Sequence, residues 1–133
     1  MTLKELNELR DMYFHIRRLR RRIAEIESAA YPQSVNTDKI VSSGNLPSSK
    51  TERVIERSEP HKAELIRLKE DYERRVSAVE SEIYALDDEF IKAVLLSRFV
   101  DGNSWRRVAR EIGGNNTEDS VRKACKRFFQ RRK

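Results

Sequence analysis

Two long segments of the chain carry apolar residues at regular steps of three and four positions, and this pattern constrains the fold most strongly. The first seam consists of Leu9, Met12, Ile16, Leu19, Ile23, Ile26 and Ala30. The second seam consists of Leu65, Leu68, Tyr72, Val76, Val79, Ile83, Leu86 and Phe90. Such steps place the apolar side chains on one side of an α-helix, as in a coiled coil. We therefore predict two long helices, each of which needs a partner along its length.

The two predicted helices have similar lengths. The first runs from about Thr2 to Ala30, and the second opens at Ser58, with Ser58 as the N-cap and Pro60 in the first turn. At 1.5 Å per residue both are roughly 40 Å long. Two such helices joined by a loop are typical of an antiparallel helical hairpin. They are equally typical of a dimer built from such helices, and the pattern leaves this choice open.

A stretch of polar residues and helix breakers separates the two helices. Tyr31-Pro32 ends the first helix, because proline disfavours a helical conformation in the residue before it. Residues 33–49 are rich in Ser, Asn, Pro and Gly, and a short helical stretch over 51–57 is compatible with the sequence. We predict a loop over about residues 31–57. Residues 1–86 as a whole are then a long-helix coiled-coil region.

Residues 87–133 have a different pattern, with three shorter helices and two tight turns. The residues that mark the helix starts and turns are Asp87 or Asp88, Asp101-Gly102, Ser104, Gly113-Gly114-Asn115-Asn116 and Thr117. Three helices with two tight turns predict a helix-turn-helix domain. The predicted fold is thus all-α, a long N-terminal helical hairpin or coiled coil followed by a three-helix C-terminal helix-turn-helix domain. Only four glycines and three prolines among 133 residues agree with a helical chain.

Positive charge is concentrated in the same C-terminal part. From Arg98 to Lys133 the sequence has eleven Lys and Arg residues and four Asp and Glu residues, a net charge of +7. The first 97 residues have a net charge of −1, so the whole excess of the chain lies in its last third. Localised positive charge on a helix-turn-helix pattern is typical of a protein that binds the phosphate backbone of DNA.

Candidate DNA-binding residues follow from this pattern. They are Arg106, Arg107, Thr117, Glu118, Asp119, Ser120, Arg122, Lys123, Lys126 and Arg127. In a helix-turn-helix the first residues of the second helix reach base edges in the major groove, where lysine donates to guanine and aspartate accepts from cytosine. We expect Arg122, Lys126 and Arg127 to meet phosphates, which position the protein without specifying a sequence. The alternative is a three-helix domain that binds protein and carries charge for solubility.

The basic run Arg17-Arg18-Leu19-Arg20-Arg21-Arg22 admits two interpretations. It is either a second patch for nucleic acid or an acidic partner, or the solvated side of a coiled coil. Consecutive residues on a helix point in different directions, so the five arginines are not expected to form one patch. We therefore favour the solvated surface.

No catalytic, metal or cofactor site is predicted. His15 and His61 lack the neighbours of a convincing metal-ligand set, and Cys125 is the single cysteine. No Gly-rich phosphate loop, nucleophile elbow or His-Glu-x-x-His motif is present. A membrane span and a signal-peptide core are also absent from the sequence pattern. We expect a protein that is not an enzyme, has no cofactor and does not contact a membrane.

The C-terminal residues resemble a known module. Leu95-Leu96-Ser97-Arg98-Phe99-Val100-Asp101-Gly102-x-Ser104-Trp105-x-x-Val108-Ala109, with the later Thr117-x-x-x-Val121-Arg122, resembles the DNA-binding module of sigma factor region four. A long helical N-terminal part followed by this module is similar to the phage and prophage late-gene transcription regulators of the RinA/ArpU type. The resemblance implies promoter DNA as the partner and activation of late genes in the bacterial host cytoplasm. It places Glu118, Asp119 and Lys123 at bases and Arg122 on the backbone.

The resemblance has two departures and leaves other functions open. The break before Thr117 is about two residues longer than in the sigma module, and two acidic residues begin the last helix. Acidic residues repel phosphate unless they face a base, so DNA binding by this module should be sequence-specific. Host RNA polymerase and a second copy of the chain are further partners that the resemblance allows. A phage small terminase subunit that binds packaging-site DNA, and a helical adaptor that contacts RNA polymerase without DNA, are the alternative functions.

Overall fold

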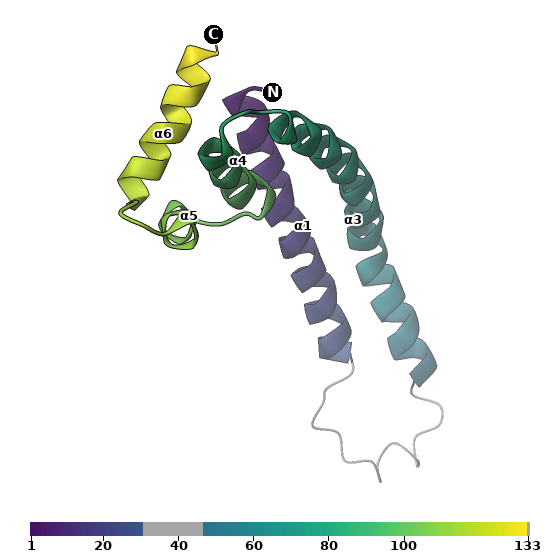
Figure 1. The fold of residues 1–133 in the computed structure, drawn as a ribbon. Helices are drawn as coiled ribbons and strands as arrows, with labels where there is room; N and C mark the ends of the chain where they lie inside the picture. Colours follow the sequence, from purple (N-terminus) through teal and green to yellow (C-terminus); the bar gives the residue numbers. More distant parts are fainter. Residues whose placement is uncertain (31–46, 133) are drawn as a thin grey trace. The chain divides into compact units, whose positions relative to one another are not determined.

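The structure is a computed structural model that describes residues 1–30 and 47–132. Its elements are α1 (Leu3–Ala30), α3 (Pro47–Tyr84), α4 (Glu89–Leu95), the π-helix η1 (Leu96–Val100), α5 (Trp105–Ile112) and α6 (Glu118–Arg131) (Figure 1). The described residues contain no strand, so the predicted all-α class is confirmed. Residues 31–46 of the predicted loop lie outside the described residues. No helix that the structure describes is both long and apolar enough to cross a membrane.

The second long helix begins earlier than predicted. Helix α3 starts at Pro47 and is continuous through the predicted cap, with Pro60 inside it. The prediction of a loop up to residue 57 is therefore wrong over 47–57, and the short helical stretch predicted over 51–57 is part of α3. Proline is tolerated in the first turn of a helix, where its missing N–H has no helical acceptor, so Pro47 suits the start. Ser58 does not cap: it is buried, and its hydroxyl donates to the Ile55 carbonyl at 3.5 Å.

The break between α3 and α4 falls where the sequence indicates. The helix that follows the break differs from the prediction, because it contains a π-helical turn. Asp88 caps α4, and its carboxylate accepts from the Ile91 N–H at 3.2 Å. The predicted single helix up to Val100 is α4 followed by the π-helix η1. The Asp101 N–H donates to the Leu96 carbonyl, five residues back, at 2.9 Å. A π-turn of this kind adds a residue to the turn and is not visible in an apolar period.

The chain divides into two compact units. The first contains Met1–Phe14 and Glu70–Lys133, and the second contains His15–Lys69. The predicted domain boundary between residues 86 and 87 falls inside the first unit. Both units include a part of α1 and a part of α3.

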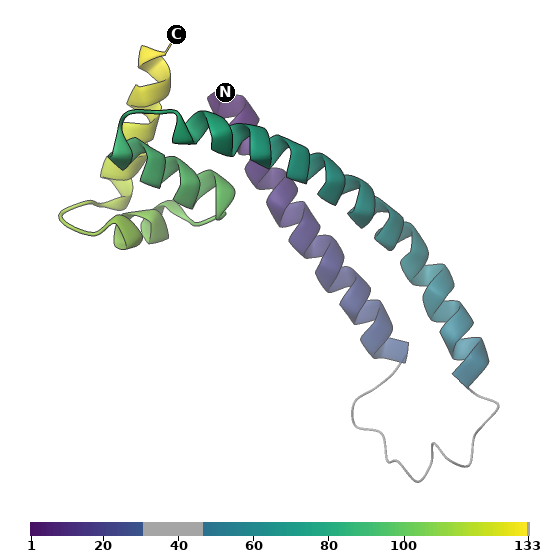
Figure 2. The same cartoon turned by 45° about the vertical axis from the view of Figure 1, so that its right-hand side comes forward.

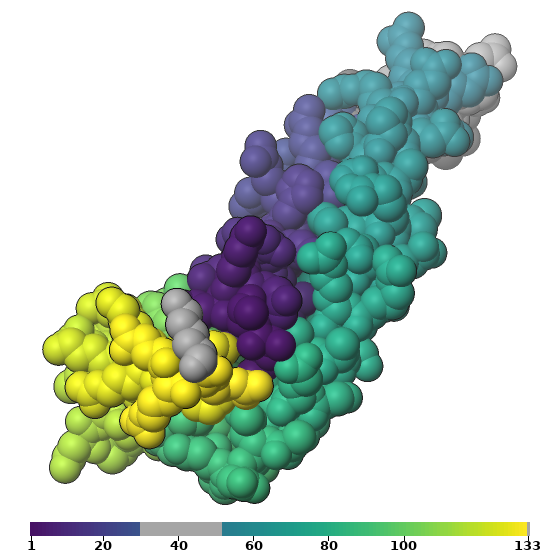
Figure 3. Space-filling view, turned by 90° about the horizontal axis from the view of Figure 1, so that it is seen from above, coloured from purple at the N-terminus to yellow at the C-terminus, as the bar shows by residue number. Residues whose placement is uncertain are grey.

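The core of the first unit combines residues from every helix in it. Figure 2 shows the ribbon of these helices. Its buried members are Leu6, Leu9, Val79, Ile83, Ile91, Val94, Leu95, Phe99, Val108, Ala109, Val121 and Cys125. Helices α4, α5 and α6 pack on one another, as expected for a helix-turn-helix. They are short, and the ends of α1 and α3 complete their core. The space-filling view shows α6 beside the first residues of α1 (Figure 3), where both line a common pocket.

The second unit is a pair of antiparallel helical segments, residues 15–30 of α1 and 47–69 of α3 (Figure 1). Its buried apolar residues are Ile16, Leu19, Ile23, Ile26 and Leu68. All five belong to the two seams identified in the sequence, and the polar Ser58 is buried as well. An ion pair between Glu27 and Lys62, 3.2 Å long, links the segments. Within the described chain, this part of the first seam lies beside α3.

Candidate nucleic-acid interface

Side-chain caps fix the starts of the two helices that would meet DNA. The Ser104 hydroxyl accepts from the Arg107 N–H at 3.2 Å at the head of α5. At the head of α6 the Thr117 hydroxyl accepts from the Ser120 N–H at 3.1 Å. The Ser120 hydroxyl in turn accepts from the Thr117 N–H at 2.8 Å, which makes a reciprocal capping box. Thr117 and Ser120, both predicted to bind DNA, therefore use their hydroxyls to begin the helix.

The turn between α5 and α6 depends on glycine. Gly113 ends α5 with φ +75°, and its N–H donates to the Ala109 carbonyl at 3.0 Å. The Asn116 side-chain amide donates to the Gly113 carbonyl at 2.9 Å. These bonds close the turn directly before Thr117. The longer break found in the sequence is thus an ordered connection.

Seven exposed basic side chains on α5 and α6 are here called the basic surface. Its members are Arg106, Arg107, Arg110, Arg122, Lys123, Lys126 and Arg127. The apolar residues of the same two helices, among them Val108, Val121 and Cys125, are buried in the core of the unit. The period of 3.6 residues per turn therefore separates a basic side from an apolar side on each helix. Six of these seven residues were predicted to bind DNA, and Arg110 has the same exposure.

Asp119 holds two members of the basic surface. Its carboxylate oxygens lie 2.8 Å from Arg122 Nη2 and 2.9 Å from Lys123 Nζ. Hydrogen bonds from Lys123 and then from Arg122 lower the pKa of the Asp119 carboxyl below its ordinary value. Among the described residues Glu118 forms no ion pair, although it is equally exposed. The two acidic residues at the head of α6 therefore differ: Asp119 forms ion pairs with its basic neighbours, and Glu118 forms none among the described residues.

Arg107 belongs to a polar network that joins η1, the following turn and α5. Its Nε donates to Glu111 Oε1 at 3.2 Å. Glu111 Oε2 accepts from the Ser97 hydroxyl at 2.9 Å and from Asn103 Nδ2 at 3.1 Å. Glu111 was not among the candidate residues, although its position four residues after Arg107 is the usual spacing of a helical ion pair.

Arg98 is structural and does not belong to the basic surface. It is half-buried, its guanidinium lies 4.5 Å from the centre of the Trp105 ring, and its Nη1 donates to the Asn103 carbonyl at 3.1 Å. Burial, and next the nearby Arg10, lower the pKa of Arg98. This contact joins η1 to the first residue of α5.

The described residues offer no group of three or more His, Cys, Asp and Glu side chains that could hold a metal ion. Cys125 is buried in the core, and burial raises the pKa of its thiol to about 11. At neutral pH the thiol is therefore protonated and a poor nucleophile. Comparisons with protein-family models, with curated proteins and with solved structures found no match to this chain.

Proposed function

We propose that the α5–turn–α6 part of the first unit binds double-stranded DNA at a defined sequence, with α6 in the major groove. The observation that carries this proposal is the basic surface, which lies on two capped helices joined by an ordered turn. Exposed Lys and Arg side chains attract the phosphate backbone and displace its counterions. A helix with one apolar side anchored in the core and one basic side exposed is the arrangement by which a helix-turn-helix approaches a groove.

The acidic start of α6 favours sequence-specific binding over general attraction to phosphate. Asp119 already neutralises part of the charge of Arg122 and Lys123, with which it pairs at 2.8 and 2.9 Å. A carboxylate that faces the groove accepts hydrogen bonds from cytosine N4 and from no phosphate. Asp119 and Glu118 should thus lower affinity for most sequences and raise discrimination for the correct one.

We propose further that the chain regulates transcription of phage or prophage genes, as the resemblance to the RinA/ArpU-type regulators implies. In that role α1 and α3 would contact host RNA polymerase or a second copy of the chain. The test is a late-promoter reporter carrying the selected duplex. A ring-shaped assembly by native mass spectrometry would indicate a small terminase subunit instead. Binding of RNA polymerase without binding of any duplex would indicate an adaptor.

The direct experiment is selection of bound duplexes from random DNA at near-physiological salt. We expect one enriched motif, and we expect binding to the selected duplex to weaken steeply as salt rises. Arg122→Ala with Lys123→Ala should weaken that binding by at least about tenfold and reduce the salt slope by about one to two units. Unchanged affinity in this double variant would overturn the proposal.

The chain offers a matched control for the double variant. Arg74 and Arg75 pair with Asp71 at 3.0 and 3.2 Å, with the same spacings of three and four residues. Arg74→Ala with Arg75→Ala removes the same charge from a half-buried acidic partner in α3, outside the basic surface, and also removes the 3.8 Å ion pair of Arg75 with Glu8. We expect duplex affinity to change by less than about twofold in this control, because a charge far from the contact acts only through the screened field.

A second variant separates specificity from affinity. Asp119→Asn removes the charge that repels phosphate and that engages Arg122 and Lys123. We expect tighter binding to unrelated duplexes and a smaller ratio of specific to nonspecific affinity, because a neutral amide no longer opposes the backbone. Equilibrium titrations of the selected duplex and a scrambled one measure this ratio. A ratio that stayed equal or rose would mean that Asp119 only positions its basic neighbours.

A further inference from the structure

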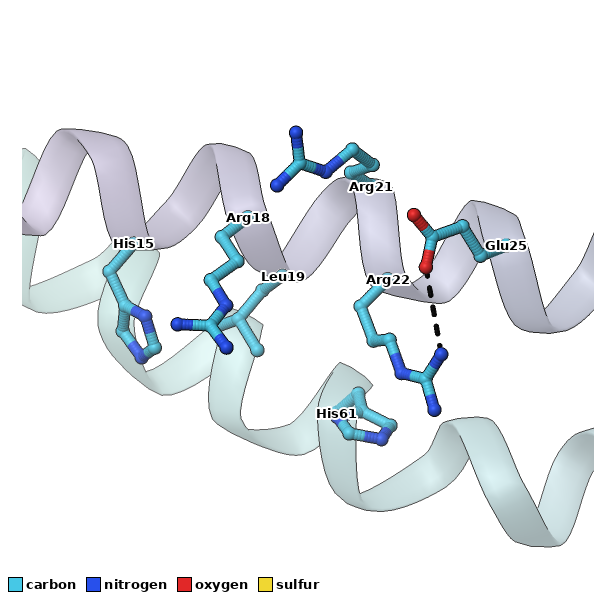
Figure 4. A pocket seen from close by; sticks show the side chains of 7 residues that line it. All are labelled: His15, Arg18, Leu19, Arg21, Arg22, Glu25 and His61. Atoms are coloured by element: carbon cyan, nitrogen blue, oxygen red, sulfur yellow. Dashed lines mark ion pairs between the residues drawn. The ribbon is translucent and has the colours of Figure 1, made fainter.

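The second unit contains a basic hollow that the proposed DNA contact does not use. It has a volume of about 450 Å³ and lies between α1 and α3 (Figure 4). Its lining residues are His15, Arg18, Leu19, Arg21, Arg22, Glu25 and His61. Both histidines of the chain are among them.

Helical spacing explains how α1 brings these side chains together. Positions 15, 18, 22 and 25 follow one another at steps of three, four and three, so they lie along one side of the helix. Arg18 and Arg22 extend from α1 toward α3, which contributes His61, and the Glu25 carboxylate approaches Arg22 (Figure 4). Three arginines of the basic run thus line one hollow. Arg17 and Arg20 are not among its lining residues, so the five arginines of the run do not form one patch, as the sequence predicted.

The positive charge of the hollow is only partly neutralised. Arg22 Nη1 lies 3.5 Å from Glu25 Oε2, and both side chains are exposed. Among the described residues Arg18 and Arg21 have no carboxylate within ion-pair distance. Three guanidinium groups and one carboxylate leave a net charge of +2 before either imidazole is counted. Like charges three and four residues apart destabilise a helix slightly, so helix stability does not explain why Arg18, Arg21 and Arg22 lie together.

The acidic group on the facing helix is engaged elsewhere. Glu64 on α3 lies close enough to His15 for an electrostatic interaction. The Glu64 carboxylate, however, accepts a hydrogen bond from Arg67 Nε at 3.0 Å. This hydrogen bond is the main reason that the pKa of Glu64 is lowered, and the proximity of His15 is a smaller one. No carboxylate of α3 therefore neutralises Arg18 and Arg21 in the described structure.

We propose that this hollow binds a small anion that carries two or three linked phosphate groups. Guanidinium groups bind phosphate oxygens through paired, charge-assisted hydrogen bonds, and imidazole N–H groups add further donors. The volume of about 450 Å³ lies within the usual range for small-molecule sites, roughly 300–1,000 Å³. Leu19 supplies an apolar surface beside the charged groups. A linked polyphosphate can meet both Arg18 and Arg22, which extend toward α3, while Arg21 extends away from α3 and adds charge at the rim (Figure 4).

The two histidines give a direct test on the full chain. Because His15 and His61 are the only histidines, a spectrum of labelled imidazole C–H groups contains two residues, both in the hollow. We expect inorganic triphosphate to shift both sets of signals in a saturable way, with single phosphate ions much weaker. Adenosine triphosphate in a parallel titration shows whether a nucleoside adds affinity or whether the phosphate chain alone suffices. Absence of any saturable shift with triphosphate would overturn the proposal.

A pair of double variants locates the site independently. Arg18→Gln with Arg22→Gln removes two lining guanidinium groups and should weaken triphosphate binding by at least about tenfold. Arg17→Gln with Arg20→Gln removes the same charge from outside the hollow and should change binding by less than about twofold. Equal weakening in both would indicate nonspecific attraction and overturn the proposal. Circular dichroism establishes that each variant keeps its helices.

The outcome with DNA is distinct. The Arg18 and Arg22 variant should bind the selected duplex as the wild type does, because the DNA contact is proposed for α5 and α6. If duplex DNA but not triphosphate shifts the His15 and His61 signals, the hollow contacts nucleic acid and the small-anion proposal fails. Failure of duplex selection with a retained triphosphate response would instead overturn only the proposed DNA function.

Discussion

At the scale of single residues, the environment of a side chain decides what its chemistry can do. Asp119 and Glu118 are neighbours at the head of α6, yet only Asp119 pairs with Arg122 and Lys123 among the described residues. Cys125 occupies the core, so its thiol serves packing. Gly102 has φ +76°, and a side chain there would meet the Tyr13 ring. The spacing of Asp119 from Arg122 and Lys123 was visible in the sequence, but the Tyr13 neighbour of Gly102 was not.

Substitution of Gly102 tests the contact with Tyr13. A Cβ at Gly102 would lie 2.5 Å from Tyr13 Cε1, at a backbone φ of +76°. We expect Gly102→Ala to lower the free energy of unfolding by about 2–4 kcal/mol through backbone strain and overpacking. Gly114→Ala is the control, because its φ is +64° and its Cβ would meet only Asn116 Nδ2, at 4.0 Å. Urea titrations should show the smaller loss there, about 1–2 kcal/mol; equal losses would mean that Tyr13 moves aside freely.

Cys125 should be nearly inert in the folded chain. Burial raises the pKa of its thiol from an ordinary value of 9.0 to about 11, so the thiolate population at pH 8 falls by about 100-fold. We expect alkylation by iodoacetamide at pH 8 to be slower than in the denatured chain by at least that factor. Mass spectrometry measures both rates. Rapid labelling under native conditions would mean that α6 opens frequently.

The raised pKa of the Cys125 thiol also makes the stability of the folded chain depend on pH. Because the folded pKa lies above the unfolded one, the thiol contributes full stability below about pH 9 and loses it as pH rises through about 11. The difference in free energy of unfolding between the wild type and Cys125→Ala should therefore shrink between pH 8 and pH 11. A difference that stayed constant over this range would contradict the burial of the ionising group.

At the scale of elements, capping residues close in sequence determine where the short helices begin. The start of the long helix α3 is not determined in this way. Asp88, Ser104 and Thr117 each cap the helix for which the sequence proposed them. Caps act within three residues, so a short pattern contains all the partners. Helix α3 instead runs through Ser58 and Pro60, because packing along its length outweighs one unfavourable residue.

Pro60 is therefore a residue whose replacement should stabilise the chain. Proline in a helix interior lacks the N–H that would donate four residues back, and its ring crowds that carbonyl. We expect Pro60→Ala to raise the free energy of unfolding of the second unit by about 1–3 kcal/mol. Thermal unfolding followed by circular dichroism measures the change. Its control is Ala63→Gly in the same exposed stretch, which should lower stability by about 1 kcal/mol. A loss of stability in Pro60→Ala would show that the local distortion is needed for packing.

At the scale of the whole molecule, the two compact units differ in how their cores are built. The first unit gathers buried residues from six elements, including Leu6 of α1, Ile83 of α3 and Phe99 of η1. The second unit buries one row of side chains between two helical segments. Local opening requires less free energy where fewer apolar contacts are lost.

Hydrogen-exchange rates of the backbone amides should differ between the two units. We expect amides of residues 15–30 and 52–69 to exchange faster than those of α4, α5 and the first turns of α6, after correction for intrinsic rates. Saturation with triphosphate should slow exchange in the second unit alone, because a ligand stabilises the conformation that binds it. Uniform protection across both units would contradict the difference in core size.

Several features of the fold were predictable because they depend on near neighbours in sequence. The apolar seams predicted the helical class and the buried positions Ile16, Leu19 and Ile83. The residues of the basic surface were predictable from the 3.6-residue period, which places Arg122 and Lys126 off the buried side that carries Val121 and Cys125. These interactions span three or four positions, and a single sequence displays them fully.

Other features required the tertiary structure, because they join residues that are distant in the chain. The sequence alone determined that the chain is helical, where most short helices begin, and that its basic excess lies in the last third. Only the tertiary structure decided that Leu6 and Ile83 complete the core under α4–α6, and that His61 faces the arginines of α1. The reason is physical: a periodic seam specifies which side of a helix is buried. The register and partner of that side depend on packing along its full length.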